Sequence, residues 1–189
     1  MTRVAVTGGI AEGKSTVLRI AADEGYATVS ADAIGREVFA EPETQHAIRV
    51  ALGLEHSPDL RASVRELIAA DRGARARLNE ITHPKILAQM FAQYPGRKIV
   101  LYEVPLLIET CIQRLFDQTW VVTCGKVEQL RRLTARLGDG AQAEALIAAQ
   151  IPTRAKFAFA DLVMRTDIEM PLVHRTVAAA LSGLGDPDR

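Results

Sequence analysis

A short stretch near the N-terminus places glycine, lysine and serine at the spacing of a phosphate-binding loop. It reads Gly8-Gly9-Ile10-Ala11-Glu12-Gly13-Lys14-Ser15, followed by Thr16, and fits the pattern G-x-x-x-x-G-K-S/T. Glycines let the backbone curl so that successive N–H groups point inward as an anion nest, and a helix that starts there adds its positive end. We expect residues 8–16 to bind a triphosphate, with Lys14 on its β- and γ-phosphates and the Ser15 hydroxyl on Mg²⁺.

The residues on either side of this loop have the patterns that the motif requires. Residues 3–7 are apolar and β-branched, which is typical of a buried parallel strand. Residues 16–24 place apolar side chains on one helical face, and Gly25 follows as a stop. Glu12 is unusual, because it puts an acid inside an anion-binding loop. We expect its side chain to point to solvent.

Two further acids follow predicted strands, and parallel strands end at the same edge of a sheet as the loop. Asp32 comes just after the strand predicted over residues 26–30. It could accept the proton of a substrate hydroxyl, cap the next helix, or do both. Glu103 lies near the end of the strand predicted over residues 98–105. It could help to hold Mg²⁺ or its waters, or pair with an arginine.

Arginines cluster on a helix predicted over residues 128–137. Arg132 and Arg136 share one face of it, four residues apart. Gly138-Asp139-Gly140 breaks the pattern before an Ala-rich helix at 141–150, and a third helix is expected to begin at 151–156. Helices joined in this way could form a lid that closes over a nucleotide and brings positive charge to the transferring phosphoryl group. A solvated arginine-rich face is the alternative.

The segment from residue 41 to residue 94 has helical patterns and no convincing strand. Helices are predicted over 44–52, 62–70 and 74–81, and the segment is too long for a simple crossover. We therefore expect an inserted helical lobe. His83-Pro84 separates two helical patterns, so that Pro84 opens the second. His83 could contact a substrate phosphate or serve as a structural histidine.

The elements together predict a P-loop NTPase fold with three α/β/α layers and a five-stranded parallel sheet. The last two strands are expected at 119–124 and 162–166, with helices opening at 106–109 and running over 171–184. One domain is predicted over residues 1–189. It comprises a core (1–40, 95–135 and 157–189), a helical acceptor-binding lobe (41–94) and a lid (136–156).

Composition narrows the class of protein further. The 189 residues contain 23 Lys and Arg and 23 Asp and Glu, so no pervasive basic field favours nucleic acid as a partner. No apolar run is long enough to span a membrane, and no signal peptide is evident. Cys111 and Cys124 lack metal-ligand spacing. We expect a cytoplasmic protein with reduced, buried thiols.

Several short motifs occur in an order that is more specific than the loop alone. They are Thr7-Gly8-Gly9-Ile10, Ala31-Asp32 with Arg36, His83-Pro84, Pro105-Leu106-Leu107-Ile108-Glu109, Gln129 with Arg132 and Arg136, Gln150, and Ala160-Asp161. Together they resemble the dephospho-coenzyme A kinase family over nearly the whole chain.

The resemblance implies transfer of the γ-phosphoryl group of ATP to the ribose 3′-hydroxyl of dephospho-coenzyme A, with Mg²⁺. It implies that Asp32 is the base, that Lys14 and Arg136 are catalytic, and that Arg132 and Arg136 join residues 8–16 in binding nucleotide. The implied acceptor contacts are Thr7, Asp32, Arg36, His83, Pro105 and Leu106, and the implied metal contacts are Ser15 and Glu103. Family members include trimers, and a monomer is equally consistent with this sequence.

The chain departs from the family pattern at five places. Ser30 replaces the first Asp of Asp-Ala-Asp, Glu103 replaces an Asp, Ala11-Glu12 replaces Gly-Ser, and Thr166-Asp167 stands where the family has Asn-x-Gly. The segment around residues 53–60 is also shortened. Two alternatives therefore stay open. One is a P-loop kinase for another small acceptor, such as a nucleoside monophosphate. The other is a nucleotide-binding regulatory protein with weakened catalysis.

Overall fold

The computed structural model describes residues 1–186, which form two compact units. The sheet unit contains Met1–Ser30 and the chain from Tyr94 onward, and the helical unit contains Ala31–Gln93. The helical unit thus begins ten residues before the start predicted for the lobe. The predicted core segment 157–189 ends in residues 187–189, which lie outside the described residues.

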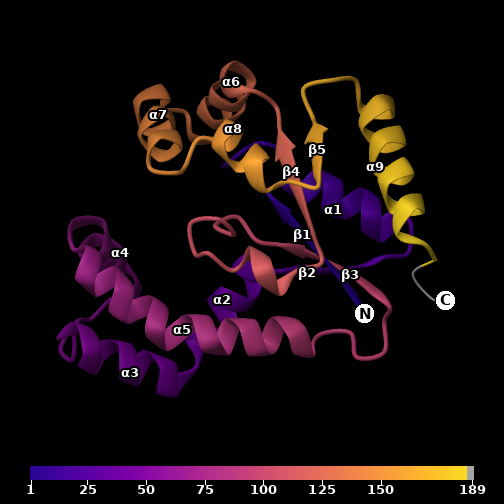
Figure 1. Ribbon diagram of the computed structural model, residues 1–189. Coiled ribbons are helices and arrows are strands. Elements are labelled where there is room, and N and C mark those ends of the chain that lie inside the picture. The colour runs from indigo at the N-terminus through magenta and orange to yellow at the C-terminus, as the bar shows by residue number, and fades with distance from the viewer. Residues whose placement is uncertain (187–189) are drawn as a thin grey trace. The chain divides into compact units, whose positions relative to one another are not determined.

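Five parallel strands form the sheet, as predicted. They are β1 (Thr2–Thr7), β2 (Ala27–Ser30), β3 (Ile99–Glu103), β4 (Gln118–Thr123) and β5 (Leu162–Arg165), in the order β2-β3-β1-β4-β5 (Figure 1). The register pairs Ser30 with Glu103 and Thr7 with Val121. The carboxyl ends of these strands therefore lie at one edge, where the loop after β1 also begins.

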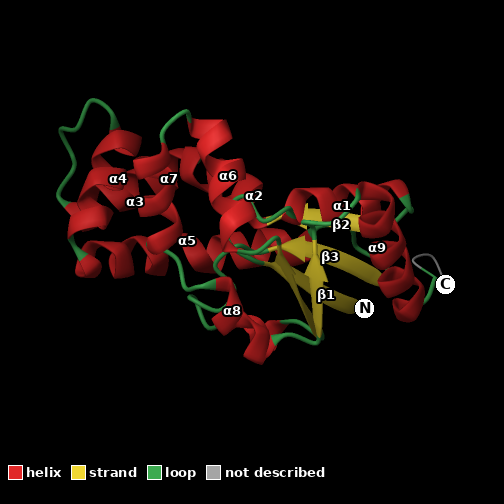
Figure 2. Ribbon diagram, turned by 90° about the horizontal axis from the view of Figure 1, so that it is seen from above, coloured by secondary structure: helices red, strands yellow, loops and turns green. Residues whose placement is uncertain are grey.

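One face of the sheet is covered by α1 (Lys14–Asp23) and α9 (Met170–Leu184), which lie together beside the strands (Figure 2). Their apolar stripes pack on strand residues that alternate with outward-facing ones, as a pleated strand requires. This core contains Val4, Val6, Val17, Ile20, Leu101, Trp120, Val122, Met164, Val173, Val177 and Leu181. The three-layer α/β prediction is confirmed on this side by a well-filled core.

On the side of β4 and β5 that faces away from α9 lie α6 (Lys126–Leu137), α7 (Gly140–Ala148) and α8 (Thr153–Lys156), followed by the 3-10 turn η2 (Phe157–Phe159) (Figure 1). Gly138 ends α6 with a φ of 74°, which glycine adopts freely. The Asp139 carboxylate caps α7 by accepting from the N–H groups of Ala141 and Gln142. The predicted glycine break between two helices is therefore present.

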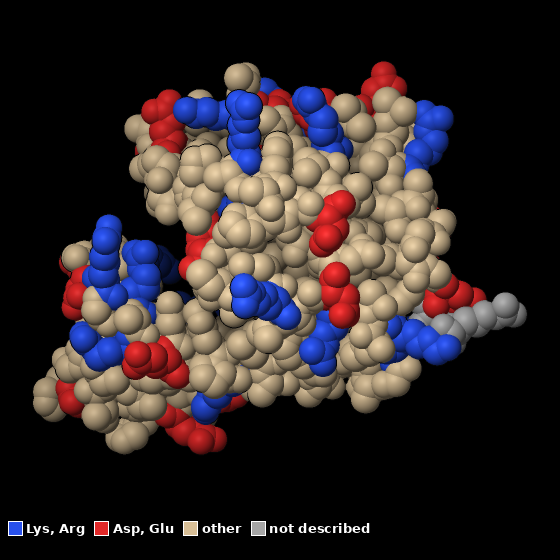
Figure 3. Space-filling model, viewed as in Figure 1, with Lys and Arg blue, Asp and Glu red and all other residues tan. Residues whose placement is uncertain are grey.

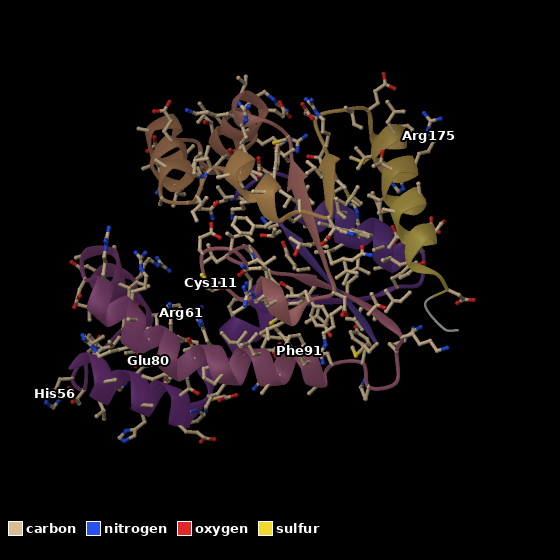
Figure 4. All side chains as sticks on the ribbon, viewed as in Figure 1. His56, Arg61, Glu80, Phe91, Cys111 and Arg175 are labelled. Carbon is tan, nitrogen blue, oxygen red and sulfur yellow. The ribbon has the colours of Figure 1, made fainter. Side chains whose placement is uncertain are left out.

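The chain after β3 differs from expectation. A helix was predicted to open at residues 106–109, but the segment forms consecutive turns that end at Cys111 with a φ of 56°. A 3-10 turn, η1 (Gln113–Leu115), follows. The prediction of a helix was wrong because apolar spacing over four residues also suits turns that bury Leu107 and Ile108. Cys111 is exposed (Figure 4), so only Cys124 fits the expectation of a buried thiol.

The helical unit consists of α2 (Ala31–Ala40), α3 (Pro42–Leu52), α4 (Leu60–Ala70) and α5 (Arg72–Ala92). It has its own apolar core, formed by Ile48, Leu52, Leu60, Val64 and Ala74 with Phe39 and Leu78 packed against it. Arg61, labelled in Figure 4, adds a cation–π contact, with its guanidinium carbon 5.0 Å from the centre of the Phe39 ring.

Two local predictions in this unit were wrong. Helix α5 runs through Pro84 without a break, although proline cannot donate to the carbonyl of Glu80. Packing of α5 against α2, α3 and α4 outweighs the lost hydrogen bond. Asp32 is not the N-cap of a helix that starts at residue 33. It is the second residue of α2 and lies inside the first turn.

Charged side chains of both signs are spread over the face drawn in Figure 3, which agrees with the balanced composition. Among residues 1–186, no helix has the length and apolar character needed to cross a membrane.

Candidate active site

The loop between β1 and α1 needs glycine at two of its positions. Gly8 and Gly13 have φ values of 150° and 95°. A Cβ at Gly8 would lie 2.3 Å from the Val122 carbonyl oxygen, and one at Gly13 would lie 2.8 Å from the Thr166 hydroxyl oxygen. Larger side chains are therefore excluded by conformation and by contact. Ala11 also has a positive φ, of 62°, although it is not glycine.

The amide groups of the loop form a partly free anion nest. Within residues 1–186, the N–H groups of Ala11, Glu12, Gly13 and Ser15 donate to no protein acceptor. They precede or begin α1, so the positive end of the helix adds to them. A phosphate group is the kind of ligand that satisfies such donors.

Two amides of the motif are already bonded. The Gly9 N–H donates to Glu12 Oε2 at 2.6 Å, and the Ile10 N–H donates to Gln150 Oε1 at 2.9 Å. Nucleotide contacts through Gly9 and Ile10 stay a prediction. A nucleotide would have to replace these two hydrogen bonds, or contact atoms of Gly9 and Ile10 other than their N–H groups.

Lys14 is held back against its own loop. Its ammonium group donates to the carbonyl oxygens of Gly8 and Gly9, at 3.2 and 2.9 Å, and the residue is 8% exposed. The charge therefore lies across the loop that carries the free amides. Ser15 and Thr16 follow in the first turn of α1, and Ser15 is exposed.

Glu12 does not point to solvent. The residue is 1% exposed, and its carboxylate accepts three hydrogen bonds. The donors are the Gly9 N–H and the Thr153 hydroxyl on Oε2, at 2.6 and 2.5 Å, and the Thr123 hydroxyl on Oε1, at 3.1 Å. The expectation of a solvent-facing acid was wrong because these donors replace water around the charge.

The rest of the loop backbone is held by side chains from late in the sequence. Gln129 Nε2 donates to the Ile10 carbonyl at 2.9 Å. The Thr166 hydroxyl donates to the Glu12 carbonyl at 2.7 Å. With Gln150 these contacts fix the loop from α6, from the connection before α8 and from the end of β5.

The two arginines of α6 have different surroundings. Arg132 donates to Glu128 at 2.7 Å and to the Thr166 carbonyl at 2.6 Å. Hydrogen bonds from Arg131 and Arg132 lower the pKa of Glu128 to about 2. Arg136 is exposed, and within residues 1–186 its side chain has no ion-pair or hydrogen-bond partner. Arg136 is therefore the one of the two with its charge available to an added anion.

Glu103 and its neighbours form the other side of the sheet edge. The Ser30 hydroxyl donates to Glu103 Oε2 at 3.3 Å, so two of the departures from the family pattern touch each other. Leu106 is 46% exposed, as an acceptor-binding residue requires. Thr7 is fully buried and donates to the Pro105 carbonyl at 3.3 Å. This burial argues against direct contact between Thr7 and an acceptor.

Three predicted acceptor-side residues belong to the helical unit. Asp32 and Arg36 are exposed on α2 and share one face, four residues apart. His83 lies half-buried on α5, which packs against α2. Burial lowers the pKa of His83, so it is mainly neutral at pH 7. The meeting of Asp32 with the phosphate-binding loop stays a prediction.

Comparisons with known proteins agree with one family. The family model described as dephospho-CoA kinase matches residues 2–171. The chain belongs to the dephospho-CoA kinase family. The dephospho-CoA kinase of Leifsonia xyli is 36% identical over 97% of this chain and 99% of its own. That of Carboxydothermus hydrogenoformans is 35% identical over 85% of this chain and 84% of its own.

Solved structures extend the likeness to the fold. TT1252 from Thermus thermophilus has a TM-score of 0.85 and 25% identity, and 98% of each chain is covered. The dephospho-CoA kinase from Campylobacter jejuni has a TM-score of 0.59, with 22% identity and 97% of each chain covered. Shikimate kinase from Acinetobacter baumannii, at 0.55 and 13% identity over 98% of this chain and 96% of its own, shares the P-loop kinase fold.

A buried ion pair gives a physical reason for part of the dephospho-CoA kinase motif, and the sequence did not reveal it. Lys156 is fully buried, 2.7 Å from Glu109 Oε1, and it also donates to the Pro105 carbonyl at 3.2 Å. Lys156 and Thr7 thus hold the same carbonyl, which fixes the turn that carries Leu106. No local pattern pairs residues 47 positions apart, so only the fold brings them together.

The residues present fit a magnesium ion held mainly by a nucleotide. Ser15 and Glu103 offer hard oxygen ligands, which Mg²⁺ prefers. Among residues 1–186 there is no cluster of three or more metal-binding side chains. This arrangement suits Mg²⁺, which is usually bound by one or two protein oxygens together with substrate phosphates.

Proposed function

We propose that this chain transfers the γ-phosphoryl group of ATP to the ribose 3′-hydroxyl of dephospho-coenzyme A, giving coenzyme A and ADP. Family membership supports the substrate pair. The observation that carries the chemistry is the nest of four amides, at Ala11, Glu12, Gly13 and Ser15, with the Lys14 ammonium across the same loop.

The loop and Lys14 supply the positive potential that phosphoryl transfer needs. Transfer passes through a transition state whose charge is spread over the equatorial oxygens of the moving group. Fixed N–H groups stabilise that charge without reorganising. Lys14 exchanges the Gly8 and Gly9 carbonyls for the β- and γ-phosphates, and Arg136 neutralises the moving group when the lid closes.

Asp32 orients the acceptor and takes its proton. As the 3′-oxygen forms its bond to the γ-phosphorus, the bond to the β,γ-bridging oxygen breaks and ADP leaves with that electron pair. The hydroxyl proton passes to the Asp32 carboxylate. Ser15 and Glu103 would hold Mg²⁺ directly or through water, and the ion would supply charge neutralisation at the phosphates. Arg36, His83, Pro105 and Leu106 bind the acceptor.

A coupled assay of ADP release tests this proposal. Purified protein with Mg-ATP is given dephospho-coenzyme A, adenosine, AMP or no acceptor. We expect turnover that depends on dephospho-coenzyme A and that falls by about 10² or more in kcat for Asp32→Asn, because a general base commonly contributes this much. An unchanged kcat in Asp32→Asn would reassign the base.

The same assay separates the rival functions. Turnover with AMP alone would keep the loop chemistry and assign a different acceptor to the helical unit. ATP binding without turnover on any acceptor would indicate a regulatory nucleotide-binding protein. The cytoplasmic location and a monomeric or trimeric assembly stay predictions.

A further inference from the structure

We propose that Glu12 is a positioning residue that couples the phosphate-binding loop to the connection between α7 and α8, and so sets the affinity for ATP. The inference rests on the proposed nucleotide site, because it concerns how that site is held in its binding shape. It assigns a role to a residue at which an acid was unexpected.

The contacts converge on one point of the loop. Glu12 Oε2 accepts from the Gly9 N–H at 2.6 Å and from the Thr153 hydroxyl at 2.5 Å. A Cβ added to Gly9 would lie 3.0 Å from both Glu12 Oε2 and Thr153 Oγ1, and 2.5 Å from Gln129 Nε2. Gly9 therefore allows these side chains to approach the backbone closely. One carboxylate oxygen thus joins the loop amide directly to the first residue of α8.

The charge of Glu12 is stabilised by neutral donors. The three groups that donate to it are two hydroxyls and one amide. Hydrogen bonds to a carboxylate are about twice as strong as neutral ones. A buried carboxylate that loses a donor suffers a large desolvation penalty. The loop is therefore sensitive to the position of Thr153, because moving that hydroxyl weakens the group that also holds the Gly9 N–H.

The connection before α8 has both a second link to the loop and room to move. Gln150 accepts from the Ile10 N–H at 2.9 Å, and Thr153 lies three residues later. A cavity of about 920 Å³ lies beside this connection and is lined by Ile147, Gln150, Thr153 and Phe157 among others. Movement of the connection into this space would change the hydrogen bond from the Ile10 N–H to Gln150 and the hydrogen bond from Thr153 to Glu12, the residue that holds the Gly9 N–H.

The two hydroxyls on Glu12 differ in what they are attached to. Thr123 ends β4, in the interior of the sheet order, whereas Thr153 begins the short helix α8. The variants Thr153→Val and Thr123→Val each remove one hydroxyl donor from the same carboxylate and keep the side-chain shape, and Thr123→Val also removes the acceptor of the Gly125 N–H, at 3.2 Å. If Glu12 only needs donors for stability, the two variants behave alike. If it couples the loop to the α7–α8 connection, they differ.

The experiment measures ATP binding by calorimetry on the full chain, together with the melting temperature and the KM for each substrate. We expect Thr153→Val to raise the Kd and KM for ATP by about tenfold, since a hydrogen bond to a charged group is removed and the loop must be ordered on binding. The KM for dephospho-coenzyme A should stay within about twofold. Both variants should lower the melting temperature by similar amounts. Thr123→Val, however, should keep an ATP Kd within about twofold of wild type.

A double-mutant cycle with Glu12→Ala completes the test. In the Glu12→Ala background, Thr153→Val should have no further effect on the Kd for ATP, because its partner is absent. If Glu12→Ala fails to fold, the pair of threonine variants still decides. Equal ATP affinities in Thr153→Val and Thr123→Val would overturn the coupling role of Glu12 and leave the proposed function standing. Failure of the wild type to bind ATP would contradict the proposed function as well.

Discussion

The sheet unit around the phosphate-binding loop and the helical unit are held together in different ways. Near the loop, side-chain hydrogen bonds join residues more than 100 positions apart, such as Glu12 with Thr153 and Ile10 with Gln129. In the helical unit many are local, such as Arg49 with the Ser57 carbonyl and Arg75 with the Ile68 carbonyl. The loop geometry is thus set by distant parts of the chain, while many side-chain hydrogen bonds of the helical unit join residues close in sequence.

This difference has a consequence for the two halves of the reaction. Hydrogen-bond donors that are already fixed in place stabilise the charge of a transition state without any reorganisation of the protein. The helical unit instead offers exposed groups, Asp32 and Arg36, on a scaffold held by its own apolar core. Substitutions at the loop should therefore act on ATP and on kcat, and those on exposed faces of the helical unit should act on the acceptor.

The largest expected effect is loss of the loop cation. Lys14→Ala should lower kcat by about 10² or more, because one group that stabilises transition-state charge is worth that much. The fold should survive, since the Lys14 ammonium donates to the carbonyls of Gly8 and Gly9 within its own loop. Steady-state ADP release and circular dichroism measure both quantities. Lys98→Ala, at an exposed lysine before β3, is the matched control. Equal kcat values for the two variants would remove Lys14 from the mechanism.

A smaller effect is expected where two departures from the family pattern touch. The Ser30 hydroxyl donates to Glu103 at 3.3 Å. Ser30→Asp would replace this donor with a second carboxylate, and like charges at such a distance repel. We expect kcat to fall by about tenfold, a change of roughly 1.4 kcal/mol in barrier height.

The double variant Ser30→Asp with Glu103→Asp restores the two acids of the family pattern. It should recover part of the lost kcat, because the shorter side chain increases the separation of the charges. The Mg²⁺ concentration dependence of kcat should be recorded for all variants. An unchanged kcat in Ser30→Asp would mean that Ser30 and Glu103 take no part in the active site.

Much of the fold followed from local patterns. Runs of β-branched and apolar residues predicted all five strands to within two residues at every end, because strands buried on both faces carry a strong signal. The loop motif gave the positions of Gly8 and Gly13, since both have conformations that favour glycine. Family resemblance supplied the identity of the substrate, which no periodicity encodes.

Two of the errors in prediction, at Glu12 and at Pro84, share a physical cause. The direction of Glu12 depends on Thr123 and Thr153, which come more than 100 residues later. The continuity of α5 through Pro84 depends on packing against other helices. Each outcome is decided by tertiary contacts that outweigh a local preference.

Ala11 allows the free-energy cost of an unfavourable local backbone conformation to be measured. Its φ of 62° is left-handed, a conformation that costs a residue with a Cβ about 1–2 kcal/mol. Ala11→Gly relieves that strain but adds unfolded-state entropy, which offsets part of the gain. We expect the free energy of unfolding to rise by about 0.5–1 kcal/mol. Urea unfolding measures this change, and a loss of stability would show that the loop is not strained there.

The smallest expected effect tests the link between helices in the helical unit. Lys85 donates to Glu41 at 2.9 Å, and this hydrogen bond, with others from Thr44 and Gln89, lowers the pKa of Glu41 below its ordinary value of 4.5. The folded state therefore binds fewer protons than the unfolded state in this range. The resulting stabilisation is present above about pH 4.5 and is lost as the pH falls through the lowered pKa.

Lys85→Met removes the charged donor and keeps a long apolar side chain. We expect the variant to be less stable than wild type at pH 7 and the difference to shrink as the pH falls below 4.5. Urea unfolding followed by circular dichroism at pH 7, 5 and 4 measures this convergence. A difference that stays constant over this range would mean that Glu41 and Lys85 contribute through packing.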